Sequence, residues 1–275
     1  MKLEINGQVV VASSGDTIYT AAKKAGIAIP GLCTSDHLVP FGSCRMCLCE
    51  VDGQSGTPAS CTTPVREGMV VHTESERLTR LRKHLVELYL SEQPAGDRVP
   101  EPLHALARSY DLTYVRYPQP AGREPVVDRS NPFFVFDNAR CISCARCVRA
   151  CDEIQGTHAL TMLYRGFASR PTAGDAALSG EAAGFASSNC VSCGACVKEC
   201  PTGALIEKSV MEEGAPVQAV RTTCAYCGVG CSFEAGVREG RVVRMVPADD
   251  GPSNEGHACM KGRFGWTYND APAFL

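Results

Sequence analysis

The sequence predicts an α+β protein assembled from several small modules, and three observations support this fold class. The 17 cysteines stand in four groups of four, with one left over, separated by cysteine-free stretches. The chain opens with two short strand patterns, KLEIN and QVVVA, joined by Asn6-Gly7, a pair that favours a tight hairpin turn. Apolar residues recur at helical spacing between residues 73 and 91. Short strands, a few helices and cysteine-rich loops are therefore expected to alternate along the chain.

The first module is expected to cover residues 1–78. After the two strands, a helix is predicted from Asp16 or Thr17 to Lys24, because Gly26 ends the pattern. The segments IAIPGLC, CRMCLCEVDG and MVVHT then indicate loops and short strands. This is the composition of a small α+β domain.

A strong helix is predicted over residues 73–91. Thr73 and Glu76 have the spacing of a capping box. An apolar stripe is expected to pack against the core, made of Leu78, Leu81, Leu85, Val86 and Leu88. Residues 79–127 hold the rest of this helix and a Pro- and Gly-rich linker, with one short helix near Leu103–Ser109.

Composition and charge exclude several classes of protein. The net charge of −3 and a pI of about 6.1 provide no basic field for nucleic acid. The start of the chain does not read as an export signal, and no apolar run is long enough for a transmembrane segment. Because disulfides suit small secreted chains, we expect a soluble, cytoplasmic protein whose thiols bind metal.

The densest cysteine groups lie in a module expected at residues 128–210. CISCARCVRAC and CVSCGACVKECP both follow the C-x2-C-x2-C-x3-C run of bacterial ferredoxins, which binds a [4Fe–4S] cluster. Zinc sites instead join two separate two-cysteine knuckles at one ion. In two-cluster ferredoxins the fourth cysteine of each run serves the other cluster. The predicted ligand sets are Cys141, Cys144, Cys147 and Cys200, and Cys190, Cys193, Cys196 and Cys151. The Ala-, Gly- and Ser-rich loop at residues 169–189 is expected to be irregular.

The first group has the spacing x10, x2, x13 and comprises Cys33, Cys44, Cys47 and Cys61. Residues 31–71, which contain it, resemble the β-grasp domain that opens the large iron–sulfur subunit of respiratory NADH dehydrogenase and of soluble NAD-linked formate dehydrogenases. The resemblance implies one [2Fe–2S] cluster on these four thiols. Gly42 would let the backbone approach the sulfurs. Cys49 is the cysteine left over and is expected to be a buried apolar side chain.

The last group, in a module at residues 217–275, comprises Cys224, Cys227, Cys231 and Cys259, whose spacing alone leaves zinc open. The pieces CAYCGVGC and CMKGR around it resemble the N-terminal [4Fe–4S] segment of molybdenum or tungsten bis-pterin oxidoreductases, above all formate dehydrogenases. The resemblance implies a third [4Fe–4S] cluster, with Lys261 between this cluster and a pterin. It also implies that the module is incomplete.

One cluster of the resembled family has no counterpart here. The family carries a His and three Cys after the helix, but residues 62–140 contain no cysteine. Gln93 stands roughly where the histidine would be, and His84 and His104 are expected to be ordinary helix residues. This cluster is therefore predicted to be absent.

Together the resemblances imply an iron–sulfur electron relay of a formate dehydrogenase. Electrons would pass between a Mo/W-bis-pterin centre, on a downstream domain or partner, and a flavin/NAD diaphorase-type subunit. No catalytic residue and no dinucleotide-binding fingerprint is expected in these 275 residues. An electron-carrier subunit of an NAD-linked hydrogenase or NADH dehydrogenase remains an alternative, as does a zinc-based interaction module.

Overall fold

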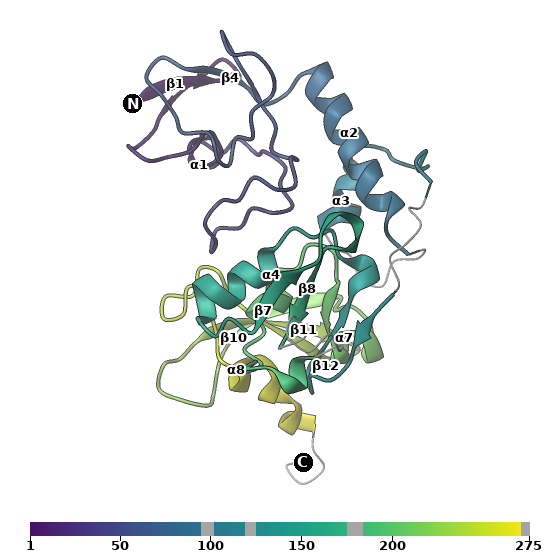
Figure 1. Cartoon of the computed structure of the whole chain (residues 1–275). Coiled ribbons are helices and arrows are strands. Elements are labelled where there is room, and N and C mark those ends of the chain that lie inside the picture. The colour runs from purple at the N-terminus through teal and green to yellow at the C-terminus, as the bar shows by residue number, and fades with distance from the viewer. Residues whose placement is uncertain (95–101, 119–124, 175–183, 271–275) are drawn as a thin grey trace. The chain divides into compact units, whose positions relative to one another are not determined.

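The computed structural model describes residues 1–94, 102–118, 125–174 and 184–270. They form two compact units (Figure 1). The first unit holds the described residues of Met1–Gln93 and Pro102–Pro120. The second holds Pro94 and the described residues from Ala121 onward.

The first unit contains a mixed sheet of four strands. The strands are β1 (Lys2–Ile5), β2 (Gln8–Val11), β3 (Glu50–Val51) and β4 (Val70–His72), in the spatial order β2-β1-β4-β3. The two outer pairs are antiparallel, whereas β1 and β4 run parallel. Helix α1 (Ile18–Lys24) follows the β1–β2 hairpin, and Thr17 caps it. This order is the predicted β-grasp arrangement, and left-handed backbone at Asn6 (φ 52°) and Gly7 (φ 81°) forms the predicted hairpin turn.

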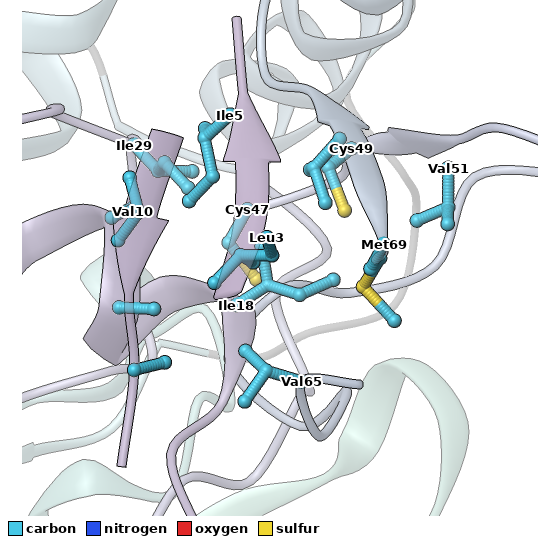
Figure 2. Close-up of a cluster of buried hydrophobic side chains, with 14 of the residues drawn as sticks. Leu3, Ile5, Val10, Ile18, Ile29, Cys47, Cys49, Val51, Val65 and Met69 are labelled. Atoms are coloured by element: carbon cyan, nitrogen blue, oxygen red, sulfur yellow. The ribbon is translucent and has the colours of Figure 1, made fainter. Parts of the chain in front are cut away.

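The sheet and α1 enclose a hydrophobic core that reaches the first cysteine group. Leu3 and Ile5 of β1 pack with Ile18 of α1, and Cys47 and Cys49 are buried among the same side chains (Figure 2). Cys49 is fully buried, as expected of an apolar side chain. The loop that carries this cysteine group is therefore anchored in the core of the unit.

Helix α2 (Glu76–Ser91) begins differently from the prediction. The Ser75 hydroxyl caps it by accepting a hydrogen bond from the Leu78 amide at 3.1 Å. The predicted Thr73–Glu76 capping box is wrong, because the Thr73 side chain and amide instead bond to Asn6 at 2.7 and 2.8 Å. Helix α3 (Pro102–Ser109) lies where the short helix was predicted.

The buried face of α2 also differs in part from the predicted stripe. Leu78 and Val86 are buried, but Leu81 and Leu85 are only half-buried, and Leu88 is 45% exposed. Between the two buried apolar residues the same face carries a buried arginine, Arg82. The prediction for Leu88 is wrong because the helix packs along positions 78, 82 and 86.

The second unit combines three small sheets. β5 (Val127–Asp128), β6 (Phe134–Asp137) and β9 (Leu205–Glu207) form one, β7 (Leu160–Leu163) and β8 (Arg170–Ala173) another, and β10 (Gln218–Thr223), β11 (Ser232–Arg238) and β12 (Arg241–Pro247) the third. All neighbouring strands in them are antiparallel. The loop at residues 169–189 was predicted to be irregular, but its first part pairs with β7 as strand β8. Residues 175–183 lie outside the described residues.

Short helical segments connect these sheets. They are α4 (Arg146–Arg149), the π-helical η2 (Ala150–Gln155), α6 (Ala195–Lys198), α7 (Lys208–Glu213), α8 (Met260–Phe264) and the 3-10 segments η1 (Asn138–Arg140), η3 (Gly166–Ala168), η4 (Phe185–Ser187) and η5 (Gly265–Asp270). Phe264 of α8 stacks on Phe133 with ring centroids 4.8 Å apart and belongs to the same buried cluster as Phe134. The last cysteine module therefore shares a core with the paired one. Among the described residues, no helix combines the length and apolarity needed to cross a bilayer.

Candidate metal centres

The first cysteine group converges in one buried loop. Cys33, Cys44, Cys47 and Cys61 are all at most 1% exposed. The amides of Leu32 and Cys33 each donate to Cys44 Sγ at 3.3 Å, and the Cys44 amide donates to Cys33 Sγ at 3.3 Å. A hydrogen bond from the Cys61 thiol is the main cause that lowers the pKa of Cys47 to about 6. Four thiols with backbone N–H donors around them fit an iron–sulfur cluster.

Helix α2 holds this loop from outside the β-grasp sheet. Buried Arg82 donates from Nε to the Met46 carbonyl at 3.1 Å and from Nη2 to the Leu48 carbonyl at 2.5 Å. The Tyr89 hydroxyl donates to the Cys44 carbonyl at 3.1 Å. Arg82 and Tyr89 were not predicted from the sequence. Arg82 lies four residues after Leu78 and four before Val86, so its spacing placed it on their face of the helix.

The structure brings the fourth cysteine of each run close to the thiols of the other run. Cys147 lies near Cys141, Cys144 and Cys200, and also near Cys196. Cys196 lies near Cys193, Cys190 and Cys151. These neighbours are compatible with the two predicted ligand sets, which stay a prediction.

The two cysteine runs have nearly the same backbone. Ser143 and Ser192 occupy equivalent left-handed positions at φ 53° and 54°, and Ala145 and Gly194 do so at 59° and 77°. The Ser143 amide donates to Cys141 Sγ at 3.3 Å, and the Ser192 amide donates to Cys190 Sγ at 3.4 Å. Left-handed backbone is costly for residues other than glycine, so its repetition indicates that the wrapped loop is needed twice.

The fourth cysteines also accept matching hydrogen bonds. The Ala159 amide donates to Cys151 Sγ at 3.2 Å, and the Leu205 amide donates to Cys200 Sγ at 3.4 Å. Burial raises the pKa of Cys144 to about 12, so without metal this thiol is neutral. Coordination to iron would deprotonate it, and N–H donors would then stabilise the thiolate. The donor set fits two iron–sulfur clusters.

A buried ion pair links the two runs. Arg146, which precedes Cys147, donates from Nη2 to Glu199, which precedes Cys200, at 2.5 Å. The two side chains are only 14% and 3% exposed. The pair fixes the first run against the second.

The last cysteine group gathers on the third sheet. Burial raises the pKa of Cys231, and the thiols of Cys224, Cys227 and Cys259 act in the same direction. Gly262 of α8 lies against Cys224 and Phe233. A Cβ added to this glycine would be 3.1 Å from Cys224 Sγ and 2.7 Å from Phe233 Cζ. Only glycine fits between this thiol and the sheet. Lys261, the neighbouring residue, is exposed.

In the segment where one cluster was predicted to be absent, Gln93 follows a helix, and His84 and His104 lie in helices. Gln93 is 9% exposed just after α2, whereas His84 and His104 are half-buried on α2 and α3. Throughout the described residues, no three His, Cys, Asp or Glu side chains are close enough to bind a single metal ion. In an iron–sulfur cube each iron takes one thiolate, so the four sulfurs must stand farther apart than the ligands of one ion.

Comparisons with protein families identify three modules in order. Residues 1–76 match the 2Fe-2S iron-sulfur cluster binding domain, residues 140–204 the 4Fe-4S dicluster domain, and residues 217–270 the Molybdopterin oxidoreductase Fe4S4 domain. These modules define the class: the chain is an iron–sulfur electron-transfer protein.

Two of the relatives are named as subunits of oxidoreductases. Over 99% of its length the chain is 34% identical to the NADPH-Fe(3+) oxidoreductase subunit alpha of Geobacter sulfurreducens, and over 96% it is 31% identical to an NADH-quinone oxidoreductase subunit of Rhizobium meliloti. A Bacillus subtilis protein provisionally named as a formate dehydrogenase is 27% identical over 98% of the chain. The chain spans about a third of the length of these curated relatives, 32%, 31% and 31% respectively.

A solved structure, the NAD+-reducing [NiFe]-hydrogenase in its H2-reduced state, contains a similar chain. It superposes with a TM-score of 0.66 and 32% identity, over 75% of this chain and 87% of the hydrogenase chain. The chain therefore belongs to the family of iron–sulfur electron-transfer subunits of oxidoreductase complexes.

Proposed function

We propose that the chain is the iron–sulfur portion of a formate dehydrogenase, relaying electrons between a Mo/W-pterin centre and a partner subunit. The observation that carries this proposal is the last module. This module matches the Fe4S4 domain of molybdopterin oxidoreductases. Its segments CAYCGVGC and CMKGR belong to the same compact unit as the paired cysteine groups. The Bacillus subtilis relative, provisionally named as a formate dehydrogenase, also supports the formate assignment.

Sixteen cysteines are the proposed ligands. Cys33, Cys44, Cys47 and Cys61 would hold one [2Fe–2S] cluster, and the other three sets would hold one [4Fe–4S] cluster each. Bound clusters supply one-electron oxidation and reduction. The protein buries most of the thiols, directs backbone N–H groups at them and fixes the spacing of the sets.

The arrangement of the thiol sets in the second unit supports transfer in series. Cys231 and Cys259 of the last set line the same cavity as Cys193 of the second set. Cys196 of that second set in turn interacts with Cys147 of the first. Electrons would therefore pass between the last set and the first set by way of the second set. We assign the [2Fe–2S] module to exchange with a flavin/NAD subunit, and the whole protein to the cytoplasm, a reducing compartment in which thiols stay available to bind clusters.

A second candidate is an electron-carrier subunit of an NAD-linked hydrogenase or NADH dehydrogenase. The likeness to the hydrogenase chain favours it. That likeness leaves a quarter of this chain unmatched, whereas the Rhizobium meliloti NADH-quinone oxidoreductase subunit matches 96% of it.

Anaerobic metal analysis of the native protein tests the proposal. Four clusters require about 14 Fe per chain. That iron together with one Mo or W, and cluster reduction by formate, is the expected result. The same iron without Mo or W would favour the carrier subunit, and zinc in place of iron would contradict both.

A further inference from the structure

A cavity in the second unit lies between two of the proposed cluster sites. Its volume is about 390 Å³. Its lining includes Cys193 from the second thiol set, Cys231 and Cys259 from the last set, and the side chain of Arg263. Arg263 is thus placed where the two sets approach each other.

Arg263 is buried and incompletely bonded. Its side chain is 1% exposed, and Nη2 donates to Glu207 Oε1 at 2.9 Å. Nε is buried without a hydrogen-bond partner among the described residues. Burying a charged group so deeply is expensive, so its retention points to a role for the charge.

The carboxylate that Arg263 contacts is shared. Arg244 donates from Nε to the same Glu207 Oε1 at 3.0 Å. Burial alone would raise the pKa of Glu207, but the two guanidinium groups outweigh burial and hold it below its ordinary value. Two arginines and one ionised glutamate leave one net positive charge in this trio.

Two other charged side chains that line the cavity are each matched by one opposite charge. Lys198 donates to Asp249 at 2.5 Å. Glu199 accepts from Arg146 at 2.5 Å. The surplus positive charge therefore comes from the Arg263 trio.

The backbone of the second cysteine run is adapted to this guanidinium. An added Cβ at Gly194, between Cys193 and Cys196, would lie 2.9 Å from Arg263 Nε and 2.8 Å from Phe264 Cζ. The equivalent position in the first run is Ala145. Of the two runs, the one that contacts α8 therefore has glycine at this position, Gly194. The Arg263 charge acts on the thiols of Cys193 and Cys196 in opposition to burial, which raises their pKa values.

We propose that Arg263 sets the reduction potential of the cluster held by Cys151, Cys190, Cys193 and Cys196. This proposal rests on the proposed electron-transfer function. A reduced cluster carries one more negative charge than an oxidised one, so a nearby buried cation stabilises the reduced state. The charge makes this site a better acceptor for electrons from the last set.

Redox titration of the full protein, followed by electron paramagnetic resonance, tests the role of Arg263. Cys193→Ser assigns the signal, because it alters the cluster that Cys193 binds. At a fixed potential, Arg263→Gln should lower the reduced-to-oxidised ratio of this cluster about tenfold, which for one electron corresponds to about 59 mV. Arg263→Lys should keep the ratio close to wild type.

Two further variants exclude a merely structural effect. Glu207→Gln removes the negative charge of the trio and should shift the ratio in the opposite direction. Arg244→Gln removes the other arginine of the trio, which does not line the cavity with Cys193, and should shift the ratio less than Arg263→Gln. An unchanged ratio in Arg263→Gln, or an equal shift in Arg244→Gln, overturns the proposal. If the Arg263→Gln protein loses the cluster, the Glu207→Gln protein provides the test. A lowered or unchanged reduced-to-oxidised ratio in Glu207→Gln would then refute the proposal. Absence of cubane signals in the wild type would instead refute the proposed function itself.

Discussion

Single residues distinguish the two cysteine runs, and the pair Gly194 and Ala145 shows how. A Cβ at Gly194 would overlap Arg263 and Phe264, and the left-handed φ of 77° adds strain. We expect Gly194→Ala to lower the free energy of unfolding by about 3 kcal/mol. The control Ala145→Gly should change it by less than about 1 kcal/mol. Thermal unfolding of the cluster-loaded protein measures both, and equal effects would show that α8 does not constrain the second run.

The proposed role of Lys261 in electron transfer from the pterin centre can be tested by substitution. It is exposed on α8, two residues after Cys259. Lys261→Ala should leave the iron content unchanged but slow electron transfer from the pterin centre about tenfold, equivalent to about 1.4 kcal/mol in the barrier. Stopped-flow reduction of the clusters by formate measures this step. A wild-type rate would remove the proposed role of Lys261.

At the residue scale, the cysteine spacing predicts the ligand sets, and the exchange of Cys151 and Cys200 between the two runs stays a prediction. The structure places Cys200 near Cys147 and Cys151 near Cys196. Arg263 was visible in CMKGR, but its partner Glu207 is 56 residues away, and no local pattern links them. Buried ion pairs of this kind arise from tertiary packing, so a single sequence could not reveal them.

At the scale of elements, α2 stabilises the first cysteine loop through Arg82. Replacing Arg82 with Met leaves the carbonyls of Met46 and Leu48 buried without their donors. We expect a loss of about 3 kcal/mol and faster release of iron from the [2Fe–2S] site. The control Arg80→Met changes an exposed arginine on the same helix. Visible absorbance during chelator challenge measures the loss, and identical rates for both variants would contradict the predicted role.

The same helix binds the segment after α3 through Glu87 and Arg116. Arg116 lowers the pKa of Glu87 from 4.5 to about 2, mainly by side-chain hydrogen bonds. Because the folded pKa lies below the unfolded one, the pair stabilises fully above pH 4.5 and loses its effect as pH falls toward 2. Glu87→Gln should therefore lower the thermal midpoint equally at pH 7 and pH 5.5. A deficit that shrinks over this interval would contradict the assignment.

The positions of helices and strands were predicted better than the caps and buried faces of the helices. Strand patterns and Asn6-Gly7 fixed the hairpin locally, and the structure contains it. The start of α2 depends on a hydrogen bond between Asn6 and Thr73, 67 residues apart, which displaced the predicted cap to Ser75. The buried face contains Arg82, so a search for apolar residues alone selected Leu88 wrongly. Strand β8 was missed because Arg170–Ala173 has the composition of a loop and gains its order by pairing with β7.

At the scale of the whole molecule, the proposed ligand sets, each completed by a cysteine of the other run, would make the paired clusters one cooperative unit. Cys147→Ser removes a buried, proposed ligand of the first cubane, near Cys196 of the second. We expect the iron content to fall by about 4 Fe from about 14, and the second unit to unfold at a lower temperature. Since Cys33, Cys44, Cys47 and Cys61 belong to the other compact unit, the [2Fe–2S] absorbance should be retained. Cys44→Ser is the matched control and should reverse the pattern, with loss of the [2Fe–2S] signal and intact cubanes. Wild-type iron and stability in Cys147→Ser would contradict the pairing, and loss of every cluster in both variants would show that the two units do not hold their metal independently.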